Sequence, residues 1–153
     1  MSTSAILLIA IGIPVFILVF LVSFMALLFY IFSRVSGWST LAQRYGAKFE
    51  PDGTLYQRQT IKVGSVRWRF AAMVGVSPSG LYLAVTPRFG PLRRLIPQPP
   101  LLIPWSDIKV VGPGHIYLGW QAVELSVGNP RITSLTVPQR LYQILAPYLT
   151  RSA

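Results

Sequence analysis

The sequence predicts an N-terminal transmembrane α-helix followed by a mainly β domain, in which about seven antiparallel strands form a partly open barrel with a C-terminal amphipathic helix. Two observations predict this fold. Residues 5–32 form an uncharged apolar run, and from residue 55 onwards short alternating segments are separated by turn residues. About 120 residues remain after the run, which is enough for one compact domain.

Residues 5–32 are expected to cross a membrane. At a rise of about 1.5 Å per residue, this run makes a helix about 42 Å long, which exceeds the roughly 30 Å of a hydrocarbon core. Tilting, or a bend at Pro14, can absorb the excess. A secretory signal peptide fits less well, because residues 1–4 carry no basic side chain and no A-x-A-like site follows the run.

The charges that flank the run predict its orientation. Residues 1–4 are uncharged, whereas the residues after the run are mainly basic, beginning with Arg34, Arg44, Lys48, Arg58 and Lys62. Basic flanks stay on the cytoplasmic side of a membrane. We therefore expect residues 1–4 to form a short extracytoplasmic tail and the C-terminal domain to lie in the cytoplasm.

Residues 33–46 are expected to form a juxtamembrane amphipathic helix. Trp38, Leu41, Ala42 and Tyr45 recur at helical spacing, and a glycine follows as a stop signal. Two interpretations stay open: Trp38 anchors the helix in the headgroup region, or the apolar stripe packs on the following domain. Residues 47–153 then form the β domain with its helix.

The first two strands are predicted to form a hairpin that turns at residues 64–65. Alternation places apolar side chains of the second strand on the inner face, namely Val66, Trp68, Phe70, Ala72, Val74 and Val76. Further strands are expected at residues 81–86, 101–104, 108–111, 115–127 and 131–137. The final helix begins at Pro138, and Pro147 should bend or shorten it.

Two sequence segments suggest a family. The strand GLYLAV and the segment PPLLIPWSDIKVV, within this layout, resemble bacterial PH-like or GRAM-like domains over residues 55–149. With GWSTLAQRY after the apolar run, PPLLIPW resembles small, uncharacterised bacterial single-pass membrane proteins that carry such a domain. The resemblance implies a PH-like domain at the bacterial inner (plasma) membrane. The phosphoinositide-reading motif of eukaryotic PH domains is not matched, so no lipid specificity is carried over.

Basic residues predominate, and they cluster on the hairpin. Fourteen Lys and Arg stand against four Asp and Glu, a net charge of +10 that points to anionic partners. The outer hairpin face gathers Arg58, Lys62, Arg67 and Arg69. Like charges opposed across a ladder are destabilising, so an anionic lipid or partner would explain them. The alternative is a solvated face, or an edge that its charge protects from aggregation.

A proline-rich loop at residues 87–100 is the second basic segment. It combines three arginines with apolar side chains, namely Arg88, Arg93 and Arg94 with Phe89 and Leu92. Apolar groups that insert beside guanidiniums that meet phosphates suit an interfacial contact. Phe89 and Leu92, with Trp38, are therefore predicted at the membrane interface. The alternative is that the apolar side chains fold back onto the barrel.

The sequence favours a protein without catalysis. It has one histidine, four carboxylates and no cysteine, and it contains no nucleophile, metal or phosphate-loop motif. We expect no enzyme activity, no cofactor and no metal. Nucleic acid is not expected either, because no recognition helix or stacking motif of a known module occurs.

These features predict a non-catalytic, membrane-anchored binding or scaffold module. A basic residue near an anionic leaflet contributes about 1 kcal/mol, far less than a transmembrane helix, so the charge is left to orient the domain or to grip a partner. The domain would lie on the anionic cytoplasmic leaflet or dock another membrane protein. Two alternatives are an accessory structural subunit of a larger membrane complex and a small-ligand sensor that uses the barrel mouth.

Overall fold

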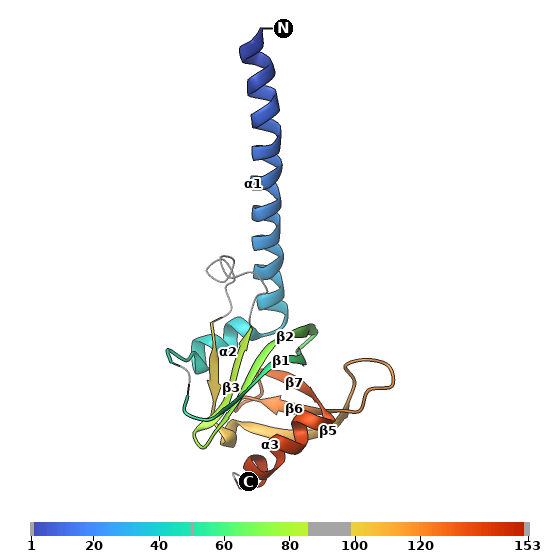
Figure 1. The fold of residues 1–153 in the computed structure, drawn as a ribbon. Coiled ribbons are helices and arrows are strands. Elements are labelled where there is room, and N and C mark those ends of the chain that lie inside the picture. The colour runs from blue at the N-terminus through green and yellow to red at the C-terminus, as the bar shows by residue number, and fades with distance from the viewer. Residues whose placement is uncertain (1, 50, 86–98, 152–153) are drawn as a thin grey trace.

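The computed structural model describes residues 2–49, 51–85 and 99–151. A long N-terminal helix leads into a seven-stranded antiparallel sheet that is curved into a half-barrel, and a C-terminal helix follows (Figure 1). The predicted layout of helix, β domain and helix is therefore confirmed.

The long helix α1 spans Thr3–Val35 and runs without interruption through Pro14. It extends beyond the predicted 5–32 at both ends. In the described part of the chain it is the one helix long and apolar enough to cross a membrane, and the side chains of its most apolar stretch are not buried. Only its C-terminal end touches the domain, where Phe29 packs against the core and Ser33 is buried.

A second helix, α2 (Trp38–Tyr45), follows after a two-residue link. Trp38 is 0% exposed, its indole Nε1 donates to the carbonyl oxygen of Pro99 at 3.0 Å, and its ring meets that of Trp68 edge-on at 6.2 Å. The predicted position of Trp38 at the membrane interface is therefore wrong. An eight-residue helix needs a docking surface, and the apolar stripe of α2 finds one in the core of the domain.

The sheet consists of two antiparallel meanders joined through β1 and β7. The strand order is β4-β3-β2-β1-β7-β6-β5, and a short 3-10 helix, η2 (Trp105–Asp107), connects the two edge strands. The strands are β1 (Thr54–Val63), β2 (Val66–Ser77), β3 (Gly80–Val85), β4 (Leu101–Ile103), β5 (Ile108–Gly114), β6 (Ala122–Val127) and β7 (Thr133–Pro138).

The β1–β2 ladder contains register shifts that the alternation pattern did not predict. Phe70 adopts a φ of 52° and is 45% exposed, so its predicted place on the inner face is wrong. Thr60 lies two residues from both Arg58 and Lys62 of the predicted outer face, yet it is buried, and its Oγ1 accepts a hydrogen bond from the backbone N–H of Phe70 at 3.2 Å. Extra residues in one strand of a ladder change which face the following side chains occupy.

The C-terminal third also differs from the prediction in its boundaries. Residues 115–121 form a loop, and β6 begins only at Ala122. Pro138 ends β7, and α3 (Gln139–Arg151) begins after it. This helix continues through Pro147, because three leucines on its inner face, Leu141, Leu145 and Leu149, are buried against the sheet.

Hydrogen bonds tie the helices to the edges of the sheet. The hydroxyl of Tyr45 in α2 donates to Asp107 Oδ2 in η2 at 2.5 Å. The indole of Trp105 donates to the carbonyl oxygen of Ser77 at 2.8 Å, and its ring stacks on that of Tyr148 in α3. Both helices of the domain are thus fixed around the connection between β4 and β5.

Substitution of Trp38 tests its place in the core. We expect Trp38→Ala to lower the free energy of unfolding by about 3–5 kcal/mol, because a cavity replaces a buried indole. Trp38→Phe keeps a ring and loses the hydrogen bond, at a cost of about 1–2 kcal/mol. Urea unfolding of the full chain in detergent micelles measures both. The exposed Trp120 provides the control, and equal midpoints for Trp38→Ala and Trp120→Ala would contradict the assignment.

The Tyr45–Asp107 hydrogen bond should make stability depend on alkaline pH. Burial and the bond to Asp107 raise the pKa of the Tyr45 phenol above 10.0. The stabilisation is therefore complete below about pH 10 and is lost as the pH rises through the higher folded-state pKa. Tyr45→Phe should cost about 1 kcal/mol at pH 7, and its difference from wild type should shrink above pH 10. A difference that stays constant up to pH 11 would argue against this linkage.

Candidate functional site at the base of the long helix

The β1–β2 turn packs on the link between α1 and α2. A Cβ on Gly64 would lie 2.8 Å from the carbonyl oxygen of Ser36, and Thr133 Oγ1 donates to that same oxygen at 2.9 Å. The N–H of Gly64 donates to the carbonyl oxygen of Ser134 at 2.8 Å. We call Ser36, Gly37, Gly64 and Thr133 the junction. It fixes the domain against the end of α1.

Lys62 and Arg67 lie nearest to the junction among the predicted hairpin residues. They face each other in the ladder, two residues from either side of the turn, or about 7 Å at 3.3 Å per residue. Arg69 is about 13 Å from the turn and Arg58 about 20 Å by the same measure. Arg58 also lies in the irregular part of β1, with a φ of 54°. The structure thus brings two of the four predicted hairpin cations, Lys62 and Arg67, close to the junction.

Arg34 adds a third cation at the same place. It lies exposed in the last turn of α1, two residues before Ser36. Sequence reasoning used it only as a topology signal, because its distance from the hairpin is not visible in the chain. We call Arg34, Lys62 and Arg67 the basic cluster. Within the described residues the one ion pair joins Arg131 to Glu124, so no described carboxylate pairs with this cluster.

An aromatic loop lies beside the basic cluster. The Arg67 guanidinium carbon is 4.3 Å from the ring centroid of Tyr117, and Tyr117 meets Trp120 edge-on at 5.1 Å. The aromatic loop comprises residues 115–121, between β5 and β6. Leu118 is fully exposed at its tip, and Trp120 is 48% exposed. The alternation of residues 115–121 predicts a strand, so this loop differs from the prediction.

The turn of the aromatic loop is well defined. The N–H of Trp120 donates to the carbonyl oxygen of Tyr117 at 3.1 Å, and Gly119 adopts a φ of 82°. A positive φ at the third position is what a type II turn requires of its glycine. Ile116 is buried and secures one side of the loop. Gly119 is the sequence signal that indicates this turn.

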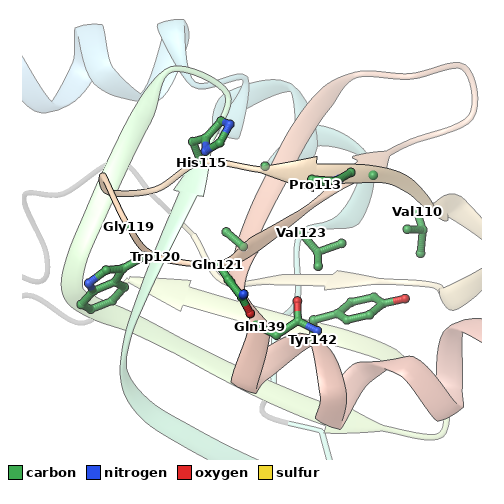
Figure 2. A pocket seen from close by; sticks show the side chains of 12 residues that line it. Val110, Pro113, His115, Gly119, Trp120, Gln121, Val123, Gln139 and Tyr142 are labelled. Carbon is green, nitrogen blue, oxygen red and sulfur yellow. The ribbon is translucent and has the colours of Figure 1, made fainter.

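A groove of about 690 Å³ lies between β5, the aromatic loop and α3 (Figure 2). Trp120 stands at one end, and Tyr142 and Gln139 reach in from α3. His115 and Gln121 are its other main polar side chains, and its lining contains no carboxylate. An acid–base pair of carboxylates therefore cannot be assembled there. Within the described ranges, no group of three or more His, Cys, Asp and Glu residues could hold a metal ion.

The predicted proline-rich loop lies largely outside the described residues. This applies to all of its candidate contacts, Arg88, Phe89, Leu92, Arg93 and Arg94. Their assignment to a membrane or partner contact stays a prediction.

No family model, curated protein or solved structure matches this chain. Its function is therefore argued from the geometry of the junction, the basic cluster and the aromatic loop.

Packing at the junction can be tested at Gly64. Gly64→Ala places a Cβ against the Ser36 carbonyl at a φ of 58°, so we expect a loss of about 2–4 kcal/mol from strain and clash combined. Gly119→Ala is the matched control, because it has a similar positive φ and nothing within 4 Å of its Cβ. It should cost only about 1–2 kcal/mol. Equal losses in urea unfolding would show that the contact with Ser36 contributes nothing.

Proposed function

We propose that the protein is a non-catalytic, membrane-anchored binding or scaffold module of the bacterial inner membrane, with its N-terminus outside and its domain in the cytoplasm. In this proposal α1 is the anchor, and the basic cluster orients the domain on the anionic cytoplasmic leaflet. One observation supports the proposal: Lys62 and Arg67 lie about 7 Å from the β1–β2 turn, and Arg34 lies two residues before Ser36, so all three cations are near the junction at the end of the proposed anchor.

In this proposal, the packing of α1 against the domain limits where the bilayer can lie. A folded polar domain does not enter hydrocarbon, so the hydrocarbon must end near Phe29, which packs against the core. The 24 residues from 5 to 28 make about 36 Å of helix against a core of roughly 30 Å, which a tilt of about 34° accommodates. Arg34 then lies at headgroup level, where a cation can meet lipid phosphates.

Packing of the helix end also supports a retained anchor over a removable signal sequence. Ser33 is buried, and Ser36 Oγ donates to the carbonyl oxygen of Ser33 at 3.2 Å. Thr133 binds Ser36 from the other side. Removal of α1 would expose these groups and part of the core. A signal peptide that is cleaved off does not need such packing against the domain.

The range of electrostatic attraction selects the residues involved. The Debye length is about 8 Å at physiological salt, so charges farther from the leaflet are largely screened. Lys62 and Arg67 lie within about one Debye length of the turn, whereas Arg58 lies more than two lengths away. Three cations at about 1 kcal/mol each are sufficient to bias the orientation of a domain that is already tethered.

The half-barrel architecture supports the PH-like resemblance as part of this proposal. Two meanders enclose the core, and α3 packs against β5, β6 and β7. Such a domain presents loops and strand ends to a partner while its core stays closed. We take docking of another membrane protein as the second use of the same face, because an acidic protein surface would satisfy the same cations.

Lipid-dependent orientation tests the proposal in the full chain. The chain has no cysteine, so Ser79→Cys introduces a single label in the β2–β3 turn, at the opposite end of β2 from the junction. We expect energy transfer from this label to acceptors on the bilayer surface to depend on anionic lipid and on salt, in reconstituted nanodiscs. Lys62→Gln/Arg67→Gln should abolish that dependence, because the cations that face the leaflet are gone.

A charge-matched control separates position from net charge. Arg58→Gln/Arg140→Gln removes two exposed cations that lie away from the junction, and it should keep the wild-type dependence. The proposal fails if the wild-type signal ignores lipid charge, or if both double variants behave alike.

A further inference from the structure

We infer that the aromatic loop inserts Leu118 and Trp120 into the interface of the same leaflet that α1 crosses. This inference rests on the proposed function, because it requires α1 to be a membrane anchor. It adds an apolar contact with lipid to the electrostatic contact of the basic cluster.

The tip of the loop is an apolar group presented to solvent by a fixed turn. Leu118 is fully exposed, while its neighbour Ile116 is 1% exposed. The Tyr117–Trp120 backbone hydrogen bond and the left-handed Gly119 define the turn before any partner binds. A preformed turn loses little conformational entropy on insertion. A single leucine and one indole are therefore enough for a favourable contact with lipid.

The side chains behind the tip suit the interface of a bilayer. Trp and Tyr are enriched at headgroup level, where their amphipathic rings lie between hydrocarbon and water. The guanidinium of Arg67 is held over the Tyr117 ring, one residue behind Leu118. Apolar groups in front and a cation behind match the order of acyl chains and phosphates in a leaflet.

Arg67 also ties the aromatic loop to the junction. It belongs to the basic cluster and contacts Tyr117, so the loop and the end of α1 both lie against the first hairpin. Figure 1 shows the loop projecting sideways from the domain, away from the C-terminal end of α3. A helix longer than the hydrocarbon core tilts, and tilt towards this side lowers the loop onto the leaflet. Insertion would therefore select the direction of tilt.

A lipid occupant is favoured over a protein one by continuity and charge. The proposed anchor would place a bilayer beside this face, and the guanidinium of Arg67 lies over Tyr117 of the loop. A protein partner, in contrast, would have to be a separate molecule in the membrane. Measurements in native membranes distinguish such a partner from lipid.

Fluorescence at residue 118 tests the inference. Leu118→Cys in the full chain provides one site for an environment-sensitive dye, and Ser79→Cys provides the matched exposed site far from the junction. In nanodiscs with brominated acyl chains and anionic headgroups, we expect a blue shift and at least twofold quenching at residue 118, with no quenching at residue 79. Equal, water-like emission at the two sites would overturn the inference. Protection at residue 118 that appears only in native membranes would also overturn it, in favour of a protein partner.

Tryptophan emission gives a second measurement without a dye. Trp38, Trp68 and Trp105 are buried, so Trp120 is the one exposed indole of the four. Leu118→Asp should reduce quenching of Trp120 by brominated lipid, and Trp120→Phe should remove the quenchable emission. Unchanged quenching in Leu118→Asp would count against insertion at the tip.

The two proposals fail in different ways. If the proposed function is wrong, energy transfer from the label at residue 79 will not depend on lipid charge. Failure of insertion leaves that dependence in place and removes quenching at residue 118.

Discussion

The carbonyl oxygen of Ser36 is the point on which the arrangement of this protein depends. It accepts a hydrogen bond from Thr133, and it lies where any side chain on Gly64 would clash. One peptide group thus joins the end of α1, the turn of the first hairpin and the start of β7. Because the contact needs a glycine at the turn, a side chain there would separate the helix from the sheet. The cations beside the turn keep a fixed place relative to α1 for the same reason.

This constraint changes the interpretation of the basic surface. The hairpin arginines and lysine form one face by alternation, but their distances from the junction differ by more than a Debye length. Lys62 and Arg67 lie near the junction, as does Arg34 from another element, whereas Arg58 lies farther along β1 in the irregular part of the ladder. Arg67 connects this cluster to Tyr117, and so the electrostatic and aromatic features form one surface.

The sequence was informative wherever composition or local spacing decides structure. The apolar run identified α1, and the residue pair at 64–65 gave a turn that sets Lys62 opposite Arg67, as the register confirms. Periodicity also grouped Trp38 with Leu41 and Tyr45. It could not say what would cover that stripe, because bilayer and core are equally apolar. Phe70 and Leu118 were misplaced for a related reason: a register shift depends on the partner strand, and H-I-Y-L-G-W alternates like a strand although Gly119 turns it.

The sheet has a mechanical consequence at the place where α1 is attached. Its two meanders are held together by β1 and β7, which share only two register pairs, Lys62 with Thr136 and Val63 with Leu135. The junction lies at the end of this seam, with Gly64 bonded to Ser134 across it. A force that reaches the domain through α1 therefore loads the shortest pairing in the sheet first. With α1 as the proposed anchor, a pull on α1 would tend to separate the two meanders at this seam.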